Sequence, residues 1–337
     1  MTRWSANPEA AAQALITSAL DHIAPTGRLL LAGAHVPLPS GTATVADWNR
    51  RFSSRITAQP SPPPGPFDVV LMRLPKSREE QQMTAHQCLG ELAPGGRLIV
   101  YGGNDEGIRS FQMTLALLGP VVTLATRGHG RVLELRCDAV TAPIKSRLED
   151  WRIEYPIDGT QARWISYPGL FAGGGHDAGT ALLLAHLPPL TERARVLDYG
   201  CGPGAIAAAC RRARPDADMT VLDNDSVALL AASQNAPGAK QILGDRLGAV
   251  GDARFDLIVS NPPLHTGFRE DTSALSALIA EAARHLTPRG AMLLVVQRRI
   301  ALERNLGQHF AGVEITADDG RYRVWKATGA RSDRSRG

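Results

Sequence analysis

The segment from Phe255 to Gly267, FDLIVSNPPLHTG, places an amide and two prolines directly after an apolar run. The run is short and β-branched, which predicts a buried parallel strand, and the prolines end it because proline has no N–H to donate to a sheet. Asn261 is therefore expected at the carboxyl end of a central strand, where open α/β sheets bind ligands. Its side-chain oxygen and the Pro262 carbonyl would be two acceptors with fixed directions, which suits a planar exocyclic amine. For these residues alone, a strand followed by an ordinary proline turn is the alternative.

A second segment, VLDYGCGPG from Val196, has the residue types of a cofactor-binding turn. Its glycines would let the backbone approach a ligand closely; they are Gly200, Gly202 and Gly204. Asp223 ends the next expected strand, about 20 residues beyond the turn, which is the spacing that binds ribose hydroxyls. A dinucleotide fingerprint also fits the glycines. The Asp198 carboxylate, however, would repel a pyrophosphate and attract a cationic amino-acid ligand, and hydride transfer does not require Asn-Pro-Pro. Both features favour a methyl donor over NAD.

The elements that must position these residues alternate along the chain, which predicts α/β domains with mostly parallel sheets. Apolar runs predict strands over 27–33, 67–74, 97–101, 195–199, 219–222, 241–243, 255–260 and 292–296. Pro94-Gly95-Gly96 is expected to turn into the strand over 97–101. Helix caps are expected at Ser77, with Glu80 completing a capping box, and at Ser226. The irregular, polar stretch over 140–167 is expected to contain the domain boundary, with domains over 1–150 and 151–337.

The two halves repeat each other in the same element order. FDVVLMRLP from Phe67 matches FDLIVSNPP from Phe255, and LAPGGRLIV from Leu92 matches LTPRGAMLL from Leu286. These shared anchors predict a duplicated domain. The first copy differs where chemistry would occur, because Arg73 replaces Asn261. In the same alignment Leu31, His35 and Pro37 replace Asp198, Gly202 and Gly204. The first copy is therefore expected to keep the sheet and to bind no cofactor.

Composition limits the remaining possibilities. The chain has 337 residues, 44% hydrophobic and 21% charged, with a net charge of +4. These values are ordinary for a globular protein, and so small a charge does not decide for or against nucleic acid. No run approaches ~18 apolar residues, and MTRWSANPEAAAQ lacks the apolar core of a secretory signal. The four cysteines form no C-x-x-C pair, so neither zinc nor disulfides are expected, and a reducing, cytoplasmic location fits.

The D-x-G-C-G-x-G loop, Asp223, Asp245 and N-P-P together resemble class I S-adenosylmethionine-dependent methyltransferases. Further motifs narrow the resemblance: P-G-x-F ending at Phe171, D-x-G-T-x-L-L-L from Asp177, N-P-P-x-H-x-G and G-R-Y-R-V. With them, the chain resembles the bacterial ribosomal RNA guanine-N2 methyltransferases, nearest the small-subunit enzymes, which also carry a degenerate N-terminal copy. The fold that this resemblance implies is two tandem Rossmann-like domains, each with a seven-stranded, mostly parallel sheet and an antiparallel last strand.

The resemblance also implies roles for individual residues. S-adenosylmethionine would be held by Asp198 at its amino-acid end, by Asp223 at its ribose and by Asp245 at its adenine, with further contacts from the glycine turn, Asn261, Phe171 and Thr180. Asn261 and Pro262 would be catalytic, and the target base would lie against Pro263, Leu264, His265 and Phe268. The family commonly has an aromatic residue where this chain has Leu264, so Phe268 or Phe171 is expected to stack on the base. His265 is expected to orient the loop or to contact RNA rather than to act as a base.

The implied reaction is methylation of a guanine N2 amine in ribosomal RNA, in the free RNA or in the assembling small subunit, with no membrane or metal partner. Methylation of large-subunit RNA or of another base amine is an alternative. A protein-glutamine methyltransferase also fits Asn-Pro-Pro, but the degenerate copy disfavours it. A non-catalytic RNA-binding scaffold is disfavoured because only one copy has lost its site residues.

Overall fold

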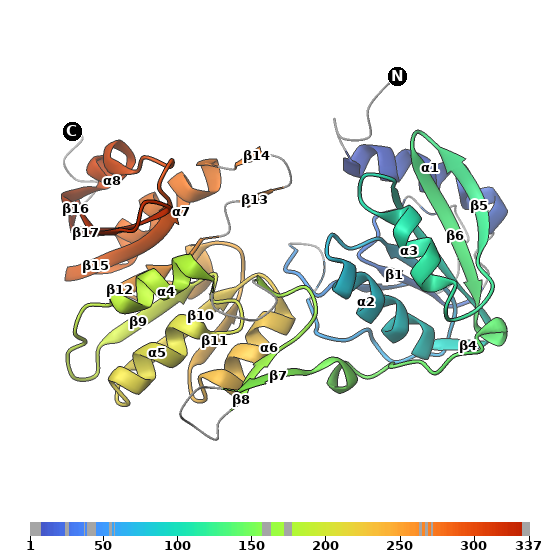
Figure 1. Ribbon diagram of the computed structural model, residues 1–337, viewed down its shortest axis with the longest axis horizontal. Coiled ribbons are helices and arrows are strands. Elements are labelled where there is room, and N and C mark those ends of the chain that lie inside the picture. Colours follow the sequence, from blue (N-terminus) through green and yellow to red (C-terminus); the bar gives the residue numbers. More distant parts are fainter. Residues whose placement is uncertain are drawn as a thin grey trace. The chain divides into compact units, whose positions relative to one another are not determined.

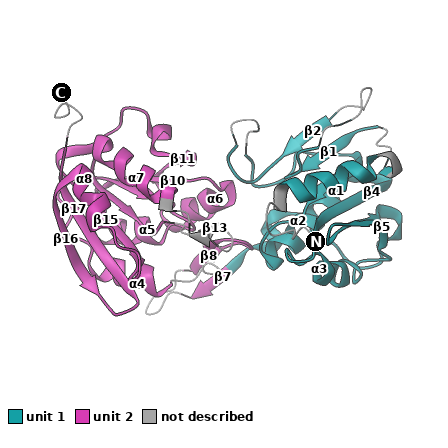
Figure 2. Ribbon diagram, turned by 90° about the horizontal axis from the view of Figure 1, so that it is seen from above, with its two compact units in different colours: residues 1–153 teal, residues 154–337 magenta. Residues whose placement is uncertain are grey.

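The computed structural model of the protein describes residues 8–23, 27–36, 38, 45–53, 56, 58–156, 163–171, 177–262, 265–266, 269–270 and 272–331. They divide into two compact units, 1–153 and 154–337, each with its own sheet (Figure 2). The division falls inside the stretch in which the sequence places the domain boundary. No helix among the described residues is long and apolar enough to span a membrane.

Unit 1 contains a six-stranded sheet with the order β2-β1-β3-β4-β6-β5. Strands β2, β1, β3 and β4 are parallel, whereas β6 is antiparallel to β4, and β5 is antiparallel to β6. The strands are β1 Leu29–Ala32, β2 Val45–Trp48, β3 Phe67–Arg73, β4 Leu92–Gly103, β5 Val122–Arg127 and β6 Gly130–Arg136. The helices are α1 Pro8–Ile23, α2 Arg78–Gly90 and α3 Ile108–Leu115. Seven strands were expected in each unit, and the described residues of unit 1 form six.

Unit 2 contains the expected seven-stranded sheet, with the order β11-β10-β9-β12-β15-β17-β16 and an antiparallel β17 (Figure 1). Its strands are β9 Arg195–Tyr199, β10 Asp218–Asp223, β11 Lys240–Leu243, β12 Phe255–Ser260, β15 Leu286–Gln297, β16 Phe310–Asp318 and β17 Tyr322–Ala330. Its helices are α4 Ala178–Ala185, α5 Ala205–Ala213, α6 Ser226–Asn235, α7 Thr272–His285 and α8 Glu303–His309. Two small pairs, β7 Ile153–Pro156 with β8 Arg163–Ser166 and β13 His265–Thr266 with β14 Arg269–Glu270, complete the set.

Both faces of each sheet are buried, which explains why the central strands are continuous apolar runs rather than alternating ones. In unit 2, one hydrophobic core lies under α4, α5 and α6, and a second lies under α7 and α8. In unit 1, α2 and α3 cover one core and α1 covers the other. Strand β12 is central in unit 2, so its carboxyl end lies in the middle of one edge of the sheet.

The structure supports the duplication with contacts that the sequence comparison only suggests. The Asp68 carboxylate accepts the Arg28 N–H at 2.7 Å, and Asp256 accepts the Arg195 N–H at 2.9 Å, at equivalent positions of the two copies. Strand β3 shifts register against β4 at the same point as β12 does against β15. The alignment of Leu31 with Asp198 holds as well, because these residues pair with Leu71 and Val259, which are equivalent in their strands.

Two local expectations for unit 1 were wrong. Pro94-Gly95-Gly96 does not precede the strand but lies inside β4, because a bulge lets the strand begin at Leu92; β15 does the same from Leu286. The capping box at α2 is incomplete. Ser77 accepts the Glu80 N–H as expected, but the Glu80 carboxylate binds Arg51 at 2.5 and 2.8 Å instead of returning to the cap.

Candidate active site

Asn261 follows β12 directly and lies at the carboxyl end of the central strand, as expected. Its side-chain NH2 donates to the Asp177 carboxylate and to the Thr180 hydroxyl, both at 2.9 Å. Asp177 is the N-cap of α4, and its other carboxylate oxygen accepts the Thr180 N–H at 2.9 Å. Within the described part of the chain, the Asn261 Oδ1 accepts no hydrogen bond, so it remains available to a ligand. Asp177 is a partner that the sequence placed in a motif without assigning it a contact.

The glycine turn lies beside Asn261 because β9 is the direct neighbour of β12. The Ser260 hydroxyl donates to the Tyr199 carbonyl at 2.7 Å and joins the two strand ends. Gly200, Gly202 and Gly204 have φ values of 66°, 51° and 89°, the left-handed region that favours glycine. A Cβ added to Gly202 would meet nothing within 4 Å, whereas one on Gly204 would lie 3.0 Å from Ala232. The backbone at Gly202 is therefore open to a ligand, and Gly204 packs against α6.

Asp198 is fully buried beneath this turn. Its Oδ2 accepts the Ala207 N–H at 3.1 Å, near the start of α5, while its buried Oδ1 has no hydrogen-bond partner among the described residues. Burial raises the pKa of Asp198 to about 7, and the Asp223 carboxylate adds to the rise. A buried, unpartnered carboxylate oxygen is costly unless a donor satisfies it. A ligand ammonium group reaching under the glycine turn would supply that donor and its charge.

Asp223 ends β10 as expected, and its carboxylate accepts the Gly202 N–H at 2.8 Å and the Asp225 N–H at 2.9 Å. Burial raises the pKa of Asp223 to about 6, and the hydrogen bonds from Asp225 and Gly202 oppose the rise. Each carboxylate oxygen has the capacity to accept a second hydrogen bond, so the Asp223 carboxylate can also accept from ribose hydroxyls. Asp225, rather than Ser226, proves to be the N-cap of α6, which corrects the sequence expectation by one residue.

Asp245 is exposed, in the loop that follows β11. The loop is held from two sides by residues that the sequence did not single out. The Tyr199 hydroxyl donates to the Asp245 carbonyl at 2.8 Å, and Glu281 on α7 accepts the Leu247 N–H at 3.0 Å and pairs with Arg246. These contacts fix the backbone of the loop, while Asp245 itself remains exposed. Its assignment to the adenine ring stays a prediction.

The remaining site residues divide by how far the structure describes them. Phe171 is 56% exposed, as a residue that stacks on a ligand would need to be, and Pro262 is buried. Pro263, Leu264 and Phe268 lie outside the described residues, as does Pro37 in the first copy, and for His265 only the backbone is described, in β13. At the equivalent position of unit 1, Arg73 replaces Asn261 and binds Glu106 at 2.6 and 3.0 Å.

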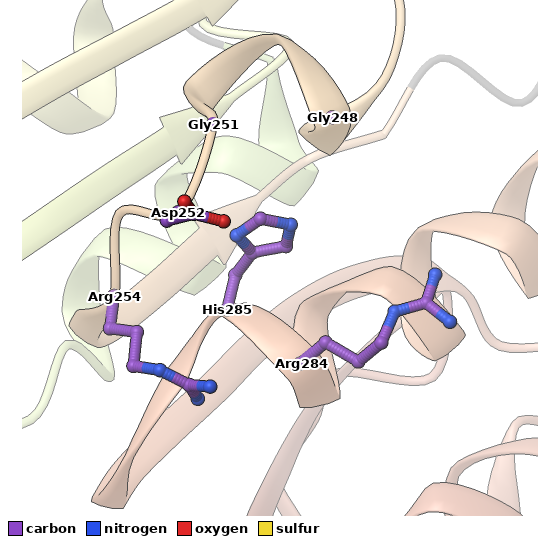
Figure 3. A pocket seen from close by; sticks show the side chains of 6 residues that line it. All are labelled: Gly248, Gly251, Asp252, Arg254, Arg284 and His285. Atoms are coloured by element: carbon purple, nitrogen blue, oxygen red, sulfur yellow. The ribbon is translucent and has the colours of Figure 1, made fainter. Parts of the chain in front are cut away.

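A separate cavity of about 480 Å³ lies at the opposite end of β12, lined by Gly248, Gly251, Asp252, Arg254, Arg284 and His285 (Figure 3). Two of its polar side chains bond backbone carbonyls: Arg254 donates to the Leu286 carbonyl at 3.1 Å, and His285 bonds the Ala253 carbonyl at 3.0 Å. Arg254 precedes the first residue of β12, and Asn261 follows the last, so this cavity is distinct from the site. Among the described residues, no group of His, Cys, Asp or Glu side chains is arranged to hold a metal ion.

Comparisons with known proteins identify the family to which the chain is similar. The family described as methyltransferase small domain matches residues 161–326, and its N-terminal domain matches residues 41–155. The ribosomal RNA small subunit methyltransferase C of Pseudomonas entomophila is 32% identical, covering 82% of this chain and 84% of its own length. The Pseudomonas putida protein of that name is 31% identical, covering 90% and 95%.

Among solved structures, the 16S rRNA N2 methyltransferase (RsmC) of T. thermophilus, in complex with AdoMet and guanosine, superposes with a TM-score of 0.75 at 26% identity. The superposition covers 90% of this chain and 88% of that one, so it includes both units. The chain therefore belongs to the ribosomal RNA small subunit methyltransferase C family.

Proposed function

We propose that this protein transfers the methyl group of S-adenosylmethionine to the N2 amine of a guanine in 16S ribosomal RNA. The reaction is the one named for the T. thermophilus relative, which was solved with AdoMet and guanosine. The observation that carries the proposal is the orientation of Asn261. Its NH2 group is occupied by Asp177 and Thr180, so a hydrogen-bond acceptor, not a donor, is presented at the carboxyl end of β12.

Unit 2 fits the cofactor on two structural grounds. The Asp198 Oδ1 is buried and has no partner within the described part of the chain, as expected for a carboxylate that receives the ammonium group of the methionine part. The open backbone at Gly202 offers a close approach, and Asp223 and Asp245 would hold the ribose and the adenine. When bound, the cofactor supplies an electrophilic methyl group on a sulfonium centre.

The residues around the target amine act by electrostatic preorganisation. The guanine N2 lone pair is delocalised into the ring, and the nitrogen becomes tetrahedral and positively charged as it bonds to the methyl carbon. The Asn261 Oδ1 and the Pro262 carbonyl accept its two N–H groups and stabilise the charge as it develops. They also fix the direction of attack, which is a large part of the rate when reacting atoms are held at about 3–3.5 Å. No strong base is required, because the proton can leave to water afterwards.

The target guanine must be unpaired or flipped, because an N2 amine inside an RNA duplex cannot reach the carboxyl end of β12. Phe171, exposed in the described structure, and Phe268 are the residues proposed to stack on it. Unit 1, without the ligand residues, is proposed to place the RNA. The proposed substrate is the assembling small subunit. We therefore propose that the protein acts in the cytoplasm, where that RNA is found.

The test uses the full chain with tritiated S-adenosylmethionine and, separately, small subunits, naked 16S RNA, large subunits and a release factor. We expect label in small subunits, recovered as N2-methylguanosine after digestion to nucleosides. Label recovered as N6-methyladenosine would refute the base assignment, and label in large subunits alone would refute the choice of subunit. Label in the release factor alone would replace the proposal with protein-glutamine methylation.

A further inference from the structure

The Asp177 carboxylate accepts a hydrogen bond from the side-chain amide of Asn261, which lies 84 positions later in the sequence. We infer that Asp177, acting with Thr180, is a positioning residue that fixes which way the Asn261 amide faces. This inference rests on the proposed function, because it concerns the acceptor presented to the target amine. It adds the requirement that residues outside the Asn-Pro-Pro segment orient the Asn261 amide.

A side-chain amide has two orientations that differ by a half-turn and are nearly equal in shape, but they exchange an acceptor for a pair of donors. Turned the wrong way, the Asn261 amide would present N–H groups to an amine that itself offers N–H groups. An ionised carboxylate accepts hydrogen bonds and cannot donate them. With Asp177 at 2.9 Å, only the orientation that places Nδ2 against the carboxylate makes a hydrogen bond. The Oδ1 must then face the other way.

The orienting group is itself held in place. Asp177 caps α4 through its Oδ1, which accepts the Thr180 N–H, so its Oδ2 is left to face Asn261. The Thr180 hydroxyl is 2.9 Å from the Asn261 Nδ2 and 3.2 Å from the Asp177 Oδ2. The hydroxyl therefore donates to the carboxylate and accepts from the amide. Both Asn261 N–H groups are satisfied by these two partners, which are set by the first turn of one helix.

The variant that tests this arrangement is Asp177→Asn, which keeps the size of the side chain. Asparagine caps helices well, but it has only one acceptor oxygen. If that oxygen keeps the cap, an NH2 group faces Asn261 and favours the reversed amide. With small subunits as substrate we expect kcat to fall about 10²-fold, as for the loss of one preorganised group. We expect KM for S-adenosylmethionine to change by less than about threefold, since a positioning residue acts on the reacting amine.

The control for a loss of capping alone is Ser77→Ala, which removes the N-cap of α2 in unit 1. It should leave kcat unchanged. The decisive comparison is a double-mutant cycle with Asn261→Ala. If Asp177 acts through Asn261, then Asp177→Asn in the Asn261→Ala background should lower kcat by no more than about twofold, whereas independent effects multiply. A further 10²-fold loss in that background would overturn the inference.

A second measurement does not depend on activity and so separates this inference from the proposed function. The side-chain NH2 resonance of Asn261, identified by its disappearance in Asn261→Ala, should shift in Asp177→Asn and in Thr180→Val. An unshifted resonance in both variants would refute the contact, even if the protein methylates RNA. A protein that methylates no RNA while the resonance shifts would refute the function and leave the contact in place. Should Asp177→Asn not fold, Thr180→Val, which keeps the backbone cap, should lower kcat about 10-fold, and an unchanged kcat would contradict the inference.

Discussion

The buried carboxylate of Asp198 predicts how cofactor affinity depends on pH. Burial raises the pKa of Asp198 from 3.8 to about 7 in the free protein. The folded state therefore favours the protonated acid. Its contribution to the free energy of unfolding is fully present below about pH 4 and is lost as pH rises to about 7, because the unfolded chain ionises first. A ligand ammonium at the unpartnered oxygen favours the ionised form instead. Affinity should consequently rise with pH across the same range.

The size of the effect follows from the ionised fraction. A group of pKa about 7 is about 3% ionised at pH 5.5 and about 75% ionised at pH 7.5, so affinity should rise about 25-fold between them. Asp223, with its pKa raised to about 6, would contribute only about fourfold over that interval. The α-amino group of the ligand stays largely protonated up to about pH 7.5, which sets the upper limit of the range.

Calorimetric titration with S-adenosylhomocysteine, which retains the ammonium and the ribose, measures this dependence. In Asp198→Asn, affinity at pH 7.5 should fall by at least about 25-fold, and the remaining slope should be no more than that of Asp223. Asp252→Asn, an exposed carboxylate at the opposite end of β12, is the matched control and should keep the full slope. An affinity independent of pH between 5.5 and 7.5 in the unaltered protein, or an unchanged slope in Asp198→Asn, would refute the placement of the ammonium group.

Three further predictions concern the same site. Asn261→Ala should lower kcat about 10²–10³-fold while S-adenosylhomocysteine binds within about threefold of the unaltered protein; calorimetry that showed an equal loss of affinity would contradict the assignment. Gly204→Ala should lower the melting temperature more than Gly202→Ala, because both substitutions strain a positive φ but only the Cβ at 204 meets Ala232. Gly202→Ala should instead weaken cofactor binding more, because the backbone at Gly202 is open to the ligand. Thermal unfolding and calorimetry that gave the reverse of these two results would contradict the open turn. Titration should also give one cofactor per chain, since Arg73 replaces the amide in unit 1, and two equivalent sites would refute the loss of the first.

The sequence was informative wherever chemistry and local structure coincide. A buried apolar run stopped by Pro262 places Asn261 at a strand end without any knowledge of the fold. The glycines of the turn likewise predict the positive φ values that the structure shows. The position of Asp198 follows in the same way, because it is two residues before the first glycine on the same strand. These inferences needed only neighbours in sequence.

Contacts between distant segments could not be predicted in this way. Asp177 stands in a sequence motif, but nothing in the sequence says that its carboxylate meets the amide of Asn261, directly after β12. Glu80 shows the converse, a local contact that the sequence predicts and the structure lacks. Its spacing from Ser77 favours a capping box, yet an arginine from another element outcompetes the backbone for its carboxylate. A tertiary partner replaced the expected local contact at Glu80 and added a contact to the helix cap at Asp177.

The two copies show why a methyltransferase sheet can keep its form after losing its site residues. The anchors that the copies share lie at the amino ends of the strands, where Asp68 and Asp256 hold the backbone of the neighbouring strand. The residues proposed to bind ligands lie at the carboxyl ends, where unit 1 places Arg73, bound to Glu106, at the position of Asn261. Strand pairing and core packing do not depend on what occupies the carboxyl end, provided that its polar groups are satisfied. In unit 1 the Glu106 carboxylate pairs with Arg73, whereas in unit 2 Asp177 accepts from the Asn261 amide, whose oxygen accepts no hydrogen bond among the described residues.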